Sequence, residues 1–214
     1  MKIKNIALVG NPNCGKTSLF NTLTGTRQKV ANYAGVTVER KEGSFKLPSG
    51  DAVRVLDLPG TYSLKPSSLD EEVTRAVCLG ELKGEILPDI FICVVDATNL
   101  SLHLSLVLEV RALNRPMILV LNMMDEVKKR GISIDKDKLS QLLGIPVVEA
   151  VAVKTKGIQD LINQLDQKNL FITPYHSELS HFEQVKQITK QVILNNDNGD
   201  KRTAFLDKIF LHPV

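Results

Sequence analysis

Eight consecutive residues near the amino terminus have the types and the spacing of a phosphate-binding loop. They fit the pattern G-x-x-x-x-G-K-[ST], directly before Ser18, and read Gly10-Asn11-Pro12-Asn13-Cys14-Gly15-Lys16-Thr17. In such a loop the glycines let successive backbone N–H groups turn toward a phosphate chain. The lysine reaches the β- and γ-phosphates and the threonine hydroxyl is a ligand for Mg²⁺. The sequence therefore predicts a loop that binds a nucleoside phosphate with Mg²⁺.

A second candidate group is Asp57-Leu58-Pro59-Gly60, which follows the apolar run at 53–56. A carboxylate at the end of a strand can hold Mg²⁺ through water, and the Gly60 N–H can meet a γ-phosphate that is present only before hydrolysis. A strand that ends in a plain Pro-Gly turn would have the same letters. Because the phosphate-binding loop lies upstream, we favour the nucleotide role.

The third group is Asn122-Met123-Met124-Asp125, at the end of the apolar run 117–121. An aspartate carboxylate can accept two hydrogen bonds from the N1–H and the amino group of guanine, whereas adenine has an acceptor at N1. Met123 stands where the related pattern N-K-x-D has lysine, and its apolar side chain can cover the base. The alternative is that Asp125 caps a helix. We favour selection of GTP over ATP by Asp125.

Two further segments complete the expected nucleotide site. In Gly35-Val36-Thr37-Val38-Glu39, Thr37 is the candidate that closes on Mg²⁺ and the γ-phosphate, as a threonine does in Ras-like GTPases. The alternative is a β-branched residue at the start of a strand. The loop Val151-Ala152-Val153 is expected to meet guanine O6. Because Val151 lacks a supporting hydroxyl, we expect a loose base pocket and fast nucleotide release.

The elements that must position these residues alternate along the chain. Apolar runs predict strands at 3–9, 37–47, 52–57, 90–95, 117–122 and 147–151, and helical patterns predict helices at 16–24, 70–80, 100–113, 135–143 and 157–168. This alternation is typical of an α/β fold, a mostly parallel six-stranded sheet with helices on both faces. A turn at Ser49-Gly50-Asp51 predicts one antiparallel edge strand. We expect a nucleotide-binding domain at 1–168 and a short helical appendage at 169–214 with a helix at 178–194.

Composition excludes several other classes. The 214 residues are 43% hydrophobic and 24% charged, with a net charge of +3, which is too small to indicate a nucleic-acid partner. Three cysteines without C-x-x-C spacing do not predict a disulfide framework or a zinc site. No apolar run approaches the roughly 18 residues of a transmembrane helix, so we expect the chain not to cross a membrane.

These motifs together resemble the cytosolic GTPase part of bacterial ferrous iron transporter B. The resemblance covers residues 3 to 168, resumes at 205–213, and rests on the phosphate-binding loop and on the segments 34–39, 57–64, 95–100 and 121–125. It implies a Ras-like P-loop GTPase fold, GTP and GDP as ligands, and a location on the cytoplasmic face of the bacterial inner membrane. The implied partners are a transmembrane domain of the same protein, with self-association left open, and no nucleic acid. The helical segment 170–204 is shorter than in the family.

The resemblance also implies how hydrolysis is assisted. Asn13 matches the asparagine that ligates K⁺ beside the phosphates in potassium-selective members of this class, so we expect K⁺-stimulated GTP hydrolysis with Lys16, Thr37, Gly60 and Asn13 as the catalytic set. The alternative is that Asn13 only caps the loop. Thr61 and Tyr62 stand where Ras-like enzymes carry a glutamine, so hydrolysis should be slow. A non-catalytic GTP/GDP sensor and a soluble RNA- or ribosome-associated GTPase are the alternative functions.

Overall fold

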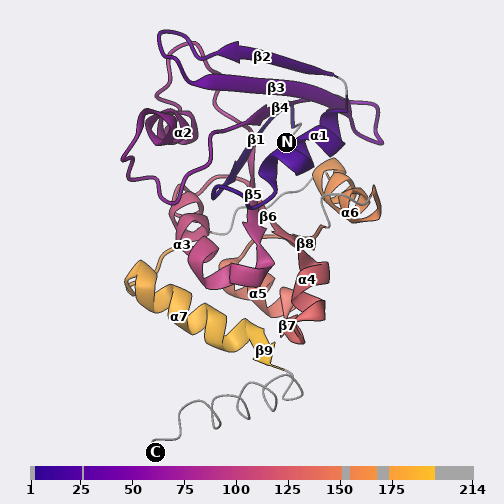
Figure 1. The fold of residues 1–214 in the computed structure, drawn as a ribbon, viewed down its shortest axis with the longest axis vertical. Helices are drawn as coiled ribbons and strands as arrows, with labels where there is room; N and C mark the ends of the chain where they lie inside the picture. Colours follow the sequence, from indigo (N-terminus) through magenta and orange to yellow (C-terminus); the bar gives the residue numbers. More distant parts are fainter. Residues whose placement is uncertain (1–2, 26, 151–154, 168–173, 196–214) are drawn as a thin grey trace, which may run out of the picture.

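The computed structural model describes residues 3–25, 27–150, 155–167 and 174–195 (Figure 1). The strands are β1 (Asn5–Gly10), β2 (Gln28–Asn32), β3 (Glu39–Lys46), β4 (Ala52–Asp57), β5 (Ile90–Asp96), β6 (Met117–Asn122), β7 (Ile132–Ile134), β8 (Val147–Glu149) and β9 (Ile193–Asn195). The helices are α1 (Lys16–Thr24), α2 (Leu69–Leu79), α3 (Leu100–Arg111), α4 (Met124–Lys129), α5 (Lys136–Leu143), α6 (Thr155–Asp166) and α7 (His181–Val192), with a 3-10 turn, η1 (Ala97–Asn99).

A seven-stranded sheet in the order β2-β3-β4-β1-β5-β6-β8 forms the centre of the molecule. Strands β1, β4, β5, β6 and β8 run parallel, and β3 runs antiparallel to both of its neighbours. The loops that follow parallel strands leave from one edge of the sheet, which is where ligands bind in α/β folds. Gly10, Asp57 and Asn122 end three of these strands.

The main sheet has seven strands, one more than the six expected. Strand β2 is fully exposed along Gln28–Asn32, so its sequence lacks the alternation of apolar and polar residues that reveals a half-buried strand. Strand β2 also takes the edge position, so the antiparallel strand β3 is not the edge strand that the turn at Ser49-Gly50-Asp51 predicts. A separate two-stranded sheet, β7–β9, and the short helix α4 were missed because three to six residues carry little periodicity.

Helices cover both faces of the sheet, as the alternation predicts. Buried side chains of α1 and α6, such as Phe20 and Leu161, pack with one face, whereas α2, α3, α4 and α5 pack with the other. The central strands β5 and β6 are almost entirely buried and apolar, which is the composition of a parallel sheet covered on both sides. None of the helices in the described residues has the length and apolarity to span a membrane.

Helix α7 packs against α3 and α5 rather than standing apart (Figure 1). Ile188 and Val192 are buried in the core cluster of that face. Phe182, at helical spacing from the buried Ile188 and Val192, is nevertheless 78% exposed, whereas Gln184 is buried. Tyr175 donates its hydroxyl proton to Gln184. The Arg111 guanidinium lies over the Tyr175 ring, 5.1 Å from the ring centroid. The domain boundary near residue 168 stays a prediction.

Candidate functional site

The loop between β1 and α1 has the backbone of a phosphate cradle. Gly15 has a φ of +90°, and a Cβ there would lie 2.0 Å from the Asn122 amide nitrogen. A Cβ at Gly10 would lie 2.5 Å from the carbonyl oxygen of Val94. A Cβ at Gly10 would collide with the backbone of β5, and the left-handed backbone at Gly15 disfavours any side chain, so both positions favour glycine. Asn13 also has a left-handed backbone, with a φ of +63°.

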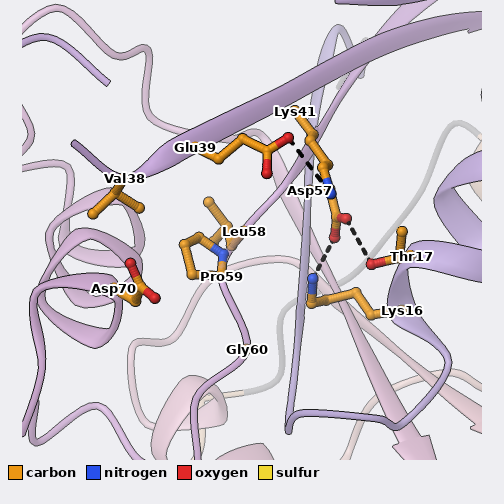
Figure 2. A pocket seen from close by; sticks show the side chains of 10 residues that line it. All are labelled: Lys16, Thr17, Val38, Glu39, Lys41, Asp57, Leu58, Pro59, Gly60 and Asp70. Carbon is orange, nitrogen blue, oxygen red and sulfur yellow. Dashed lines mark hydrogen bonds and ion pairs between the residues drawn. The ribbon is translucent and has the colours of Figure 1, made fainter. Parts of the chain in front are cut away.

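Two adjoining cavities open around this loop. The first, of about 490 Å³, is lined by Asn11, Pro12, Asn13, Gly15, Lys16, Thr17, Ser18, Gly60 and Met123. The second, of about 260 Å³, is lined by Lys16, Thr17, Val38, Glu39, Lys41, Asp57, Leu58, Pro59, Gly60 and Asp70 (Figure 2). Lys16, Thr17 and Gly60 line both. The structure thus brings the first two predicted groups together around Lys16.

At the floor of the second cavity, Asp57 joins the two side chains of the phosphate-binding loop (Figure 2). The Lys16 ammonium forms an ion pair with one carboxylate oxygen, and the Thr17 hydroxyl donates to the other over 3.1 Å. A hydroxyl and a carboxylate side by side are oxygen ligands of the kind that Mg²⁺ prefers. The Asn11 amide is buried with no hydrogen-bond partner among the described residues, which fits a loop shaped to meet a ligand.

The third predicted group follows β6 beside the phosphate-binding loop and reaches the first cavity through Met123. Asn122 donates from its amide to the Cys14 carbonyl over 2.9 Å and so ties β6 to the phosphate-binding loop. Met123 lines the cavity. Asp125 lies within the first turn of α4, whose N-cap residue is Met123, so the alternative of Asp125 as an N-cap is wrong. Met124 is buried. Val151, Ala152 and Val153 lie outside the described residues.

Only part of the segment 33–39 lines the second cavity. Val38 and Glu39 line the second cavity, whereas Thr37 is exposed and lines neither, and Gly35 and Val36 lie in the turn before it. Tyr33 anchors that turn: the residue is 3% exposed, its N–H donates to the Val38 carbonyl over 3.0 Å, and burial raises the pKa of its phenol. A Mg²⁺ role for Thr37 therefore requires this turn to move, and it stays a prediction.

The segment after Gly60 is held by two acidic residues. Glu71 accepts from the Thr61 hydroxyl over 3.2 Å and from the Ser67 hydroxyl over 2.7 Å, and the bond from Ser67 lowers the pKa of Glu71. Glu109 on α3 accepts from the Ser63 hydroxyl over 2.9 Å. Tyr62, which stands where Ras-like enzymes carry the glutamine that orients water, is 52% exposed and lines neither cavity.

Sequence reasoning missed two residues of the second cavity, Lys41 and Asp70. Lys41 stands directly opposite Asp57 in the β3–β4 pair. Strand alternation puts Lys41 on the same face of β3 as Glu39, two residues away, but it does not show that this face lines the cavity. Asp70 belongs to the first turn of α2.

No cluster of three or more histidine, cysteine or carboxylate side chains that could hold a metal occurs in the described parts of the chain. Cys14 is a buried residue of the phosphate-binding loop, and its burial raises the pKa of its thiol to about 11. The thiol is therefore protonated at neutral pH and contributes bulk rather than charge to the loop.

Comparison with known proteins agrees with this geometry. A profile of the family described as ferrous iron transport protein B matches residues 4–165. The chain belongs to this family. It is 46% identical over 188 residues to the Fe(2+) transporter FeoB of Salmonella typhimurium strain LT2, covering 86% of this chain and 23% of that protein.

Solved structures of family members have the same fold. The cytosolic domain of L. pneumophila FeoB matches with a TM-score of 0.81 at 32% identity, over 90% of this chain and 100% of that one. The cytosolic domain of the T. maritima FeoB iron transporter in its GMPPNP form matches with a TM-score of 0.77 at 33% identity, over 90% of this chain and 100% of that one. The Ras-like P-loop GTPase fold is thereby confirmed.

Proposed function

We propose that this chain binds and slowly hydrolyses GTP as the cytosolic part of a ferrous iron transporter. The observation that carries the proposal is the cluster of Lys16, Thr17 and Asp57 where two cavities meet at the edge of the sheet. Family membership supports it, since a T. maritima relative is described in a GMPPNP form. The chain spans about 23% of the length of the curated relatives that it matches, so transport itself would be carried out elsewhere in the protein.

Different residues would bind the phosphates, hold Mg²⁺ and position the loop after Gly60 during hydrolysis. Lys16 leaves Asp57 and binds the β- and γ-phosphates, while the Gly60 N–H contacts the γ-phosphate. Thr17, Asp57 and, after movement of its turn, Thr37 would hold Mg²⁺, which neutralises phosphate charge when bound. Glu71 and Glu109 position the segment 61–64 through the hydrogen bonds described above. Thr61 and Tyr62 replace the glutamine that orients water, so turnover is slow.

Asn13 would hold K⁺ beside the phosphates. It is exposed, lines the first cavity, and its side chain makes no hydrogen bond within the described residues, so nothing there supports the alternative of a loop cap. A cation at this position neutralises charge that develops between the β- and γ-phosphates. Asp125 would select guanine, and Val151, Ala152 and Val153 would meet its O6 atom.

A second candidate function is a GTP/GDP sensor that does not turn over. The exposure of Tyr62 outside both cavities favours it, because the side chain that could orient water is absent from the site. In either case the chain would act at the cytoplasmic face of the bacterial inner membrane, with GTP or GDP and its own transmembrane domain as partners. Self-association is a further candidate, and nucleic acid is not.

The deciding experiment measures phosphate release from GTP in KCl and in NaCl at equal ionic strength, with ATP as the control nucleotide. We expect hydrolysis of GTP alone, faster in K⁺, with the K⁺ effect lost in Asn13→Ala. GTP binding without turnover in either salt would favour the sensor. Equal rates with GTP and ATP would refute guanine selection. Asp125→Asn tests the same selection, because this variant should lose affinity for GTP.

A further inference from the structure

The second cavity contains a cation that the reaction described above does not use. Lys41 lines the cavity together with Lys16, Asp57 and Gly60, and Figure 2 shows its side chain extending from β3 toward Asp57. Lys41 and Asp57 are direct cross-strand partners, so their side chains leave the same face of the β3–β4 pair. Gly60, which contacts the γ-phosphate in the proposed function, lines the same cavity.

The two arginines near Lys41, Arg40 and Arg54, form ion pairs with glutamates outside the cavity. Arg40 donates to Glu85 over 2.7 Å, and Arg54 contacts Glu42 over 3.0 Å and also pairs with Glu85. Because alternate residues of a strand point to opposite faces, Arg40 and Glu42 lie on the other face of β3 from Lys41. Arg40 is therefore committed to a closed ion-pair network and cannot serve as an arginine finger without breaking it.

Lys41 itself is only weakly held. Its ammonium lies 3.7 Å from a Glu39 carboxylate oxygen, with the two side chains 36% and 53% exposed. An exposed ion pair of this kind contributes little to stability, so a stronger anion can displace Glu39. A γ-phosphoryl group is such an anion, since it carries charge on three oxygens and accumulates more of it in the transition state.

We propose that Lys41 is a catalytic residue that donates to the γ-phosphoryl oxygens from β3 and stabilises their charge during hydrolysis. This inference rests on the proposed function. Asn13 lines the first cavity but not the second, so Lys41 and a cation at Asn13 would act from different sides of Lys16. The charge that an arginine finger supplies in other GTPases thus comes in part from the strand that follows the segment 33–38.

The test uses Lys41→Met, with Lys46→Met as the matched control, because Lys46 is exposed on the same strand and lines neither cavity. Three quantities are measured: single-turnover GTP hydrolysis at saturating Mg²⁺, the affinity for GDP, and the affinity for GDP with aluminium fluoride, which mimics the transferring phosphoryl group. We expect Lys41→Met to lower the hydrolysis rate about tenfold or more and to weaken the fluoride complex equally, with GDP affinity unchanged. Lys41→Arg should restore part of the hydrolysis rate and part of the affinity for the fluoride complex. Lys46→Met should match the wild type in all three quantities.

Each other outcome is decisive. Normal hydrolysis by Lys41→Met would overturn the inference and leave the proposed function standing. A changed Mg²⁺ requirement with a normal rate at saturating Mg²⁺ would also overturn it, because Lys41 would then act on Asp57 rather than on the phosphoryl group. Failure of the wild type to hydrolyse GTP would overturn the proposed function and this inference with it.

Discussion

The Lys16 ammonium and the Asp57 carboxylate form a direct ion pair, with only 9% and 3% of their side chains exposed. The group that would bind phosphate and the group that would bind metal therefore neutralise each other when neither ligand is present. Burial of two opposite charges is tolerable only as a pair, because either one alone would lack the solvation that water provides.

Asp57→Asn should destabilise the nucleotide-free chain, because the Lys16 ammonium is then buried without a counter-charge. We expect the free energy of unfolding, measured in urea without nucleotide, to fall by about 2 kcal/mol. GDP should restore part of this loss, since phosphate replaces the carboxylate as the partner of Lys16. Asp137→Asn, on an exposed position of α5, is the control and should change stability by less than about 0.5 kcal/mol. An unchanged stability of Asp57→Asn would contradict the pairing.

The cysteines should be unreactive in the folded chain. Cys14, Cys78 and Cys93 are all buried, and burial raises the pKa of Cys14 to about 11, that of Cys78 to about 12, and that of Cys93 well above its usual value. At pH 8 a thiol with a pKa near 11 is about one part in a thousand thiolate. A chromogenic disulfide reagent should therefore titrate three thiols in denaturant and none rapidly under native conditions. A fast native thiol would show that one of these sites opens.

His103 should make stability depend on pH. It is 5% exposed, its Nδ1 has no partner among the described residues, and burial lowers its pKa below 6.5, an effect that Asp96 partly opposes. As the pH falls, the unfolded chain takes up the proton first, so this contribution to the free energy of unfolding is complete above about pH 6.5 and is lost below it. Urea unfolding between pH 7.5 and pH 5 should show the decline, and His103→Gln should flatten it. The exposed His181→Gln should leave the wild-type dependence intact, and an equal slope in His103→Gln would disprove the assignment.

Helix α7 should contribute to the stability of the whole chain. Val192 is 0% exposed against α3 and α5, so Val192→Ala removes buried methyl groups and should lower the free energy of unfolding by about 2 kcal/mol. Phe182→Ala, in the same helix but 78% exposed, should change it by less than about 0.5 kcal/mol. Chemical denaturation followed by circular dichroism measures both. Equal effects would mean that α7 is not packed as described.

Most elements could be predicted because their periodicity is strong. Helix α1 and strands β4 and β6 begin and end where the sequence predicts, since each is bounded by a loop motif or a turn. Strand β2 and helix α4 could not be predicted in this way. An exposed edge strand and a six-residue helix have too few buried positions to leave a pattern.

For the site, the sequence alone predicted which residues bind phosphate, because a glycine-rich loop, a lysine and a threonine at fixed spacing have few other uses. It also determined the family. Only the tertiary structure decided that Lys16 pairs with Asp57, that Lys41 faces the same cavity, and that Arg40 does not. It also placed Thr37 outside both cavities. The physical reason is that these relations join different elements of the chain, and a one-dimensional pattern carries no information on which faces of two elements meet.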